Sequence, residues 1–109
     1  MSTFALGLDV DGDGYHPAAW RRASHSPAEL LTPRRVRTVV AAAENAGFTF
    51  ALFDDSPVAG APGPDTQGRI DAVTRAAFVA GSTSAIGLVP VASTTYSEPF
   101  HVATQIASL

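Results

Sequence analysis

A run of alternating acidic residues near the N-terminus is the first part of the chain whose residue types could do chemistry. The segment Asp9-Val10-Asp11-Gly12-Asp13-Gly14 has carboxylates at alternate positions and glycine sixth, which is the spacing of a calcium-binding loop. The twelfth position of such a loop is a bidentate Glu, and Trp20 stands there instead. We therefore favour a turn in which the Asp side chains accept hydrogen bonds from nearby backbone N–H groups.

The same segment also resembles the opening motif of haloacid dehalogenase-like phosphatases, in which an apolar strand is followed by Asp-x-Asp-Gly. In that alternative Asp9 is the nucleophile and Asp11 is the acid. Three features oppose it: Asp13 stands where Thr or Val is usual, the chain has no Lys to hold a phosphate, and the Asp54-Asp55 pair comes too early. The phosphatase remains the second interpretation of the sequence.

Three histidines are candidates for proton transfer or hydrogen bonding, but His16, His25 and His101 lack the local spacing of a metal site. His25 lies among Ser and Pro and is expected at the surface. His101 falls in the first turn of a predicted helix, where it is either exposed or close to a binding site. His16 is the histidine of most interest, because it lies in the long first loop beyond the predicted strand and an imidazole can hydrogen-bond or exchange a proton near neutral pH.

Strands and helices are predicted to alternate along the chain. Apolar runs typical of buried strands cover residues 4–8, 48–53 and 86–92, the last with Pro90 inside it. Apolar residues at helical spacing predict helices between Thr32 and Gly47 and between Ile70 and Gly81, the second with an apolar face formed by Ile70, Val73, Ala77 and Ala80. A third helix is expected to begin with Ser97 as its cap and Pro99 in its first turn. This order predicts an α/β fold with right-handed crossovers and a parallel sheet.

Polar residues follow each predicted strand. Ligand sites of parallel α/β sheets lie beyond the carboxyl ends of the strands, so these residues should converge on one edge. They are Asp9, Asp11, Asp13, Tyr15 and His16 after the first strand, Asp54 and Asp55 after the second, and Ser93, Thr94, Thr95 and Tyr96 after the third. The connecting segments 10–31 and 56–68 are expected to be loops.

The composition is that of a small globular domain. Of 109 residues, 46% are hydrophobic and 16% are charged, and the formal net charge is -3. All seven cationic side chains are Arg, and we interpret the cluster at 34–37 as a solvated face, with no nucleic-acid partner. The sequence has no Cys, no secretory signal and no apolar run of the roughly 20 residues that span a bilayer. We expect a cytoplasmic protein with no membrane partner.

Three further stretches occur in an informative order: Tyr15-His16-Pro17-Ala18-Ala19-Trp20-Arg21, residues 46–55, and Ile86-Gly87-Leu88-Val89 with residues 92–100. Together they resemble the first loop, the second strand and the third strand with its helix in one family. This family is the nitrilotriacetate monooxygenase-type branch of the bacterial luciferase-like flavin-dependent monooxygenase superfamily.

The resemblance implies a (β/α)₈ TIM barrel, which has roughly 250 residues or more. Residues 1–109 would then be the first three β/α units of an incomplete barrel, the N-terminal part of a truncated luciferase-like monooxygenase domain. Members usually continue past the equivalent of Leu109 into Asp and a Ser-x-Gly-Arg stretch, and their phosphate-binding site lies in later units. We therefore expect this fragment to be inactive by itself.

The chemistry implied by the resemblance is the oxygenation of a small organic substrate by O₂. The cofactor is reduced FMN from a separate flavin reductase, or in some relatives the deazaflavin F420, and the full-length enzyme is expected to be a homo-oligomer. The carried-over residues fall into two groups, with no metal ligands. Those against the flavin are Asp55, Ala92, Ser93 and Thr94, and those facing the substrate or oxygen, with catalytic roles, are His16 and Tyr96.

Two residues depart from the family pattern. Val91 stands where many members have Thr, and Thr104 stands where Arg is common.

A non-enzymatic small α/β module is a further alternative, but it accounts only for the alternation of elements. Such a module would need a polar third helix, whereas Val102, Ile106 and Leu109 would leave apolar surface uncovered.

Overall fold

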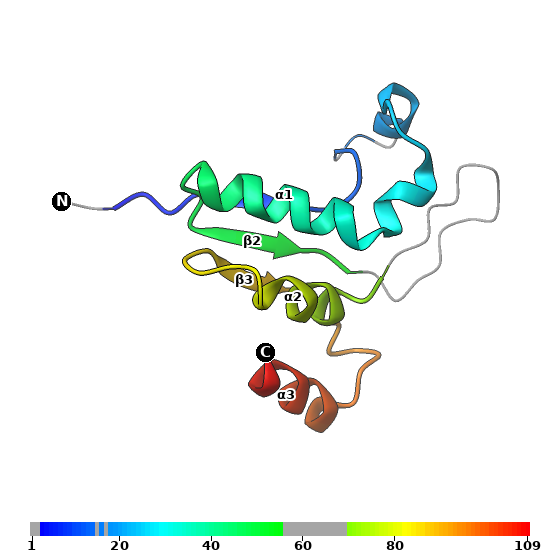
Figure 1. The fold of residues 1–109 in the computed structure, drawn as a ribbon. Helices are drawn as coiled ribbons and strands as arrows, with labels where there is room; N and C mark the ends of the chain where they lie inside the picture. The colour runs from blue at the N-terminus through cyan, green and yellow to red at the C-terminus, as the bar shows by residue number, and fades with distance from the viewer. Residues whose placement is uncertain (1–2, 15, 17, 56–69) are drawn as a thin grey trace.

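The computed structural model describes residues 3–14, 16, 18–55 and 70–109 (Figure 1). Three strands alternate with three α-helices, as the sequence predicts, and two short 3₁₀ helices lie in the first loop. In chain order the elements are β1 (Gly7–Asp9), η1 (Ala19–Arg22), η2 (Pro27–Leu31), α1 (Pro33–Asn45), β2 (Phe50–Phe53), α2 (Ala72–Ala80), β3 (Gly87–Pro90) and α3 (Pro99–Ser108). The predicted loop at 56–68 lies outside the described residues, as do Tyr15 and Pro17.

The three strands form one parallel sheet in the order β1-β2-β3, which confirms the predicted topology. Gly7 of β1 pairs with Phe50 of β2, and Phe50 pairs in turn with Gly87 of β3. A Cβ atom at Gly7 would overlap the ring of Phe50, so glycine leaves the room that this ring occupies. Gly7, Phe50 and Gly87 therefore form one row across the three strands, with Phe50 of β2 in the middle.

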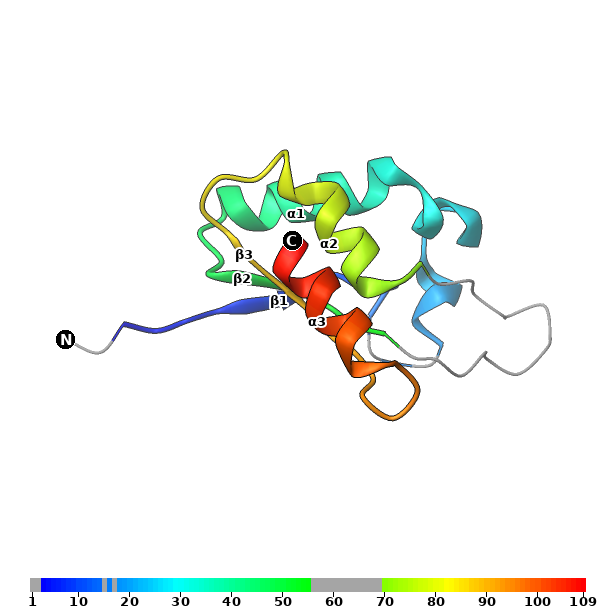
Figure 2. The same ribbon diagram turned by 90° about the horizontal axis from the view of Figure 1, so that it is seen from below.

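Helices α1 and α2 cover one face of the sheet (Figures 1 and 2). Successive residues of a strand point to opposite faces, and in β2 it is Ala51 and Phe53 that face the helices and are fully buried. The helices contribute small and branched apolar side chains to the same core. These are Val40 and Ala43 of α1 and Ala72, Ala76 and Val79 of α2, joined by Ile86 before β3.

Helix α1 begins and ends as the sequence predicts. The Thr32 hydroxyl accepts a hydrogen bond from the Arg35 N–H at 3.3 Å, and Pro33 occupies the first turn. At the other end Gly47 has φ +85°, a left-handed conformation that favours glycine.

The other two helices differ from expectation in detail. Helix α2 begins at Ala72 with Asp71 as its cap, and it buries Ala76 rather than the expected Ala77. Gly81 does end α2, but with an ordinary φ of −69°. The cap of α3 is Glu98, not Ser97, because the Glu98 carboxylate accepts the His101 N–H at 2.9 Å.

The first strand is shorter than predicted. Residues 4–6 precede β1, and Phe4 and Leu6 are exposed, so this run is not buried on both faces. Pairing begins only where β2 is present as a partner: the Leu6 carbonyl accepts the Thr49 N–H at 2.7 Å. The apolar character of residues 4–6 therefore does not reflect burial within the described chain.

Helix α3 lies beyond β3 (Figure 1), and none of its residues is buried against the rest of the described chain. Phe100 and Ile106 of the helix and Leu109 after it are exposed, which agrees with the uncovered surface expected at Ile106 and Leu109, whereas Val102 is half-buried. Among the residues described, no helix combines the length and the apolarity that crossing a bilayer requires.

Glu44, near the end of α1, holds the segment before β3. Its Oε1 accepts backbone N–H groups of Ser84 at 2.8 Å, Ala85 at 2.6 Å and Ile86 at 3.1 Å. These hydrogen bonds, first those from Ala85 and Ser84, lower the pKa of the Glu44 carboxyl. One side chain thus ties α1 to the amino end of β3.

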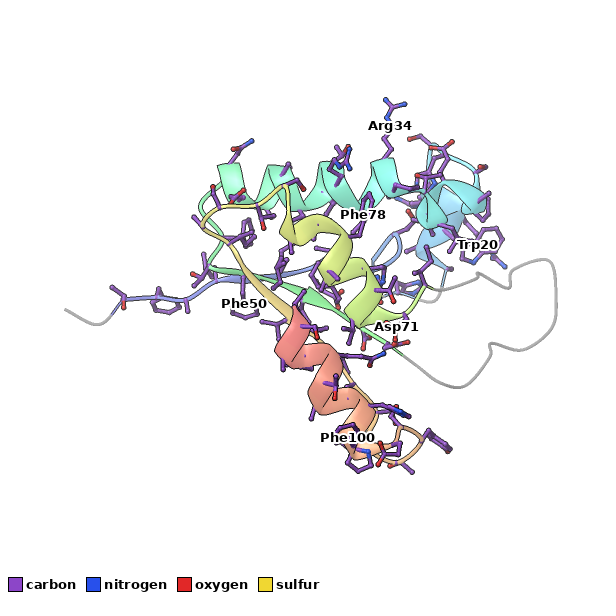
Figure 3. All side chains as sticks on the ribbon, turned by 60° about the horizontal axis from the view of Figure 1, so that its bottom comes forward. Trp20, Arg34, Phe50, Asp71, Phe78 and Phe100 are labelled. Carbon is purple, nitrogen blue, oxygen red and sulfur yellow. The ribbon has the colours of Figure 1, made fainter. Side chains whose placement is uncertain are left out.

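We expect Phe53→Ala to lower the free energy of unfolding by about 3–5 kcal/mol, because it empties a fully buried site. The matched control is Phe100→Ala on α3, where the ring is 72% exposed and projects from the helix (Figure 3). Its effect should stay within about 0.5 kcal/mol. Denaturant unfolding followed by circular dichroism measures both, and equal losses would contradict the described core.

We also expect acid to remove the contribution of Glu44. Because the pKa of Glu44 is lowered by folding, its contribution is present above the ordinary value of 4.5 and is lost as the pH falls through the folded pKa. As the pH is lowered from neutral to below 4.5, the unfolding midpoint of Glu44→Gln should therefore decrease less than that of the parent chain. The control Glu29→Gln, at an exposed position in η2, should retain the parent profile.

Candidate active site

The carboxyl ends of the three strands lie at one edge of the sheet, since all three are parallel. Three segments leave the sheet there: the first loop after β1, the Asp54-Asp55 segment after β2, and residues 91–98 after β3 (Figure 1). Ligand sites of parallel α/β folds lie at this edge. The polar residues predicted from the sequence belong to these segments.

Asp55 connects the end of β2 with the start of α2. Its Oδ2 accepts the Ala72 N–H at 3.1 Å, in the first turn of that helix, where backbone N–H groups have no partner within the helix. The Asp55 N–H in turn donates to Asp54 Oδ1 at 2.8 Å. The first turn of α2 thus holds the carboxylate of Asp55, and the Asp54 side chain holds its backbone N–H.

Arg75 of α2 reaches the same edge. Its Nη1 donates to Asp11 Oδ1 in the first loop, and its Nη2 donates to the Asp54 carbonyl. Its Cζ lies 5.8 Å from the centre of the Phe53 ring. The Arg75 and Asp11 side chains are only 12% and 14% exposed, so this is a mostly buried ion pair.

The three carboxylates of the first loop turn to three different partners. Asp9 Oδ1 accepts the Asp11 N–H at 3.0 Å, Asp11 pairs with Arg75, and Asp13 pairs with His25. The hydrogen bond of Asp9 is the backbone-satisfying turn that the sequence favoured over a calcium loop. Asp9 and Asp11, which a phosphatase would use together, are divided between this turn and the ion pair.

His25 is not the isolated surface residue expected from the sequence. Its Nε2 lies 2.6 Å from Asp13 Oδ1 and its Nδ1 lies 2.9 Å from the Ser26 carbonyl oxygen. Both partners are acceptors when Asp13 is ionised, so this geometry favours the imidazolium form, in which both ring nitrogens donate. The Ser26 carbonyl and then the Asp13 carboxylate raise the pKa of His25. Arg35 also approaches Asp13, at 3.9 Å, from the first turn of α1.

The two residues predicted to be catalytic are exposed. His16 Nδ1 accepts the Ala18 N–H at 3.1 Å, so a neutral His16 ring carries its proton on Nε2. Tyr96, in the segment before α3, is 71% exposed. Of the residues predicted to contact the flavin, Ala92 and Ser93 are half-buried and Thr94 is exposed, directly after β3.

Sequence reasoning missed three side-chain contacts, two in this region and one, that of Glu44, at the amino end of the sheet. Arg75, Glu44 and the Asp13–His25 pair were not assigned partners. The sequence does contain a signal for the contact of Arg75, because this Arg is the only charged residue in a stretch of apolar and small residues one turn after Asp71. A lone Arg there must reach an acidic partner or solvent, and the first loop contains three Asp residues.

Comparison with known sequences identifies the family to which this chain belongs. The sequence profile described as luciferase-like monooxygenase matches residues 13–109. The chain therefore belongs to the luciferase-like monooxygenase family, as its resemblance indicated. Membership of this family replaces both the phosphatase and the non-enzymatic module as interpretations of the sequence.

Two curated relatives match nearly the whole chain. It is 34% identical over 105 residues to N-acetyl-S-(2-succino)cysteine monooxygenase of Bacillus subtilis (strain 168), which covers 95% of this chain and 24% of the relative. It is 31% identical over 117 residues to nitrilotriacetate monooxygenase component A of Aminobacter aminovorans, covering 95% of this chain and 26% of the relative. The chain thus spans about a quarter of the length of these enzymes.

A solved structure shares the fold. EDTA monooxygenase from Chelativorans sp. BNC1 superposes with a TM-score of 0.84 at 24% sequence identity, covering 95% of this chain and 26% of that one. The three parallel strands and their helices therefore have the arrangement of one part of the EDTA monooxygenase fold.

We expect the contribution of His25 to stability to depend on pH. Because folding raises its pKa, the contribution is fully present below the ordinary value of 6.5 and is lost as the pH rises through the folded pKa. The unfolding midpoint of the parent chain should fall as the pH rises through this range, and that of His25→Gln should change less. The control His101→Gln, at an exposed position on α3, should retain the parent profile, and a parent-like profile in His25→Gln would contradict the imidazolium assignment.

Proposed function

We propose that residues 1–109 are the N-terminal part of a luciferase-like monooxygenase domain and supply the first three β/α units of its (β/α)₈ barrel. Two described surfaces support this proposal. Helix α3 is not buried against any described element, and Val89 on β3 is exposed on the sheet face opposite α1 and α2. In a barrel that sheet face lines the interior, and neighbouring units cover the helices.

The cofactor that we propose is reduced FMN, with the deazaflavin F420 as the alternative. A flavin ring is an aromatic plane with hydrogen-bonding groups along its edge. Ala92 and Ser93 fit it, because they are small and half-buried and allow a plane to approach the end of β3. Asp55 fits as well, because a carboxylate can accept several hydrogen bonds and one of its oxygens is already fixed by the Ala72 N–H.

When bound, reduced FMN would supply two electrons, so that one oxygen atom of O₂ enters a small organic substrate and the other leaves as water. We propose that a separate reductase provides the reduced cofactor. The name of one relative supports this, because the nitrilotriacetate monooxygenase of Aminobacter aminovorans is called component A.

The roles of the chain's own residues follow from their positions. Asp55 would orient the ring, and Ala92, Ser93 and Thr94 would pack against it. His16, with its proton on Nε2 when neutral, would donate a hydrogen bond to the substrate from the first loop. Tyr96 would approach from the segment before α3, and its hydroxyl can donate or accept. These side chains would position the substrate and exclude water from the reaction.

The observation that carries this proposal is the shared edge. Parallel pairing of β1 with β2 and of β2 with β3 directs the segments of His16, Asp55 and Ser93 to the same end of the sheet. The family match over residues 13–109 supports monooxygenase chemistry at that edge.

We expect the 109-residue chain to bind FMN weakly or not at all, because three β/α units enclose only one side of a flavin. Titration of oxidised FMN, followed by quenching of its fluorescence, should show no saturable one-to-one complex at micromolar protein. A tight one-to-one complex would contradict the proposed division of the site among further barrel units.

A longer polypeptide, in which further β/α units follow Leu109, tests the cofactor directly. It should bind FMN one to one, and Asp55→Ala should weaken that binding, whereas Glu29→Ala in η2 serves as the matched carboxylate control. Preferential binding of F420 would replace FMN by the deazaflavin alternative. Failure of the folded protein to bind either cofactor would contradict the proposed function.

A further inference from the structure

The mostly buried Arg75 contacts two segments that meet at the carboxyl edge of the sheet. Its guanidinium donates to the Asp11 carboxylate after β1 and to the Asp54 carbonyl after β2, and it lies over the ring of Phe53. A planar guanidinium presents several N–H groups in a fixed fork, so it can hold two acceptors at once. The two acceptors here belong to two different connections of the sheet.

Arg75 faces protein rather than a ligand. Its side chain is 12% exposed and its Nε atom is shielded from solvent. A direct contact with a substrate would therefore require rearrangement of the edge. The contacts instead give Arg75 a role in fixing other residues.

The residue that Arg75 fixes is adjacent to Asp55. Arg75 holds the Asp54 carbonyl, Asp54 Oδ1 accepts the Asp55 N–H, and Asp55 Oδ2 accepts the Ala72 N–H. The helix that starts at Ala72 carries Arg75 itself, so these hydrogen bonds close a ring between the end of β2 and the first turns of α2. Asp11 joins the first loop to this ring.

We propose that Arg75 is a positioning residue that clamps the first loop and the end of β2 together, and thereby sets the orientation of Asp55. The proposal rests on the proposed function in one respect only, namely that Asp55 contacts the flavin. The clamp itself is a property of the chain without cofactor.

Coupling across the clamp can be measured in the 109-residue chain by amide hydrogen exchange at Asp55 and Ala72. We expect both Asp11→Asn and Arg75→Gln to speed exchange at these amides about ten-fold, the factor expected for loss of one charge-assisted hydrogen bond. In the double variant the effect should not exceed that of Arg75→Gln alone, because the two substitutions break the same link. The control Arg34→Gln removes an Arg that points away from the body of the protein (Figure 3) and should leave the rates unchanged.

A conservative variant separates geometry from charge. Arg75→Lys keeps the positive charge but replaces the fork by a compact ammonium, so exchange should remain faster than in the parent chain. Full restoration by Lys would overturn the clamp in favour of a simple charge effect.

Unchanged exchange in Asp11→Asn would also overturn the clamp, and this variant leaves α2 intact if Arg75→Gln fails to fold. Additive effects in the double variant would do the same. None of these measurements involves flavin, so they fail independently of the FMN titration that tests the proposed function.

Discussion

Hydrogen bonding of β2 to both neighbouring strands is the constraint on which the rest of this structure depends. Residues 50–52 of the strand pair with β1 on one side and residues 50–53 pair with β3 on the other, and Ala51 and Phe53 are buried beneath α1 and α2. Because both pairings are parallel, the direction of β2 fixes the direction of its neighbours. All three connections that could carry chemistry therefore leave the sheet at the same edge.

The two ends of this sheet are each secured by one charged side chain, with different consequences. At the amino end Glu44 collects three backbone N–H groups before β3 and joins α1 to that strand. At the carboxyl end Arg75 joins the first loop to the end of β2. In (β/α)₈ barrels the amino end serves stability and the carboxyl end serves catalysis. In the barrel that we propose, Glu44 would serve the first role and the neighbours of Arg75 would serve the second.

Much of the fold could be predicted from the sequence because local signals agreed with the tertiary structure. Thr32 begins and Gly47 ends α1 as their chemistry requires, and the apolar runs predicted three strands that alternate with the helices. The buried face of α2 was misassigned because alanine stands at several positions of that helix, so hydrophobicity does not distinguish them. The cap of α3 was misassigned because Ser97 and Glu98 can both accept an N–H group, and the path of the preceding segment decides between them.

The candidate site was less predictable, for a physical reason. The residues after each strand follow from topology, but their partners depend on contacts between distant segments. Arg75 and Asp11 are 64 residues apart in sequence, and no periodic pattern relates them. The same holds for the loop itself, where His25 returns to Asp13 although its neighbours Ser24 and Ser26 suggest an exposed turn.

The row formed by Gly7, Phe50 and Gly87 has a consequence for how this sequence can change. One large ring stands between two residues without side chains, and the volume of that ring fills the space above Gly7. The sizes of the side chains at these positions are therefore interdependent. A bulkier residue at position 7 is compatible with this sheet only when a smaller side chain replaces Phe50. The side-chain sizes at positions 7 and 50 should therefore change together among related sequences.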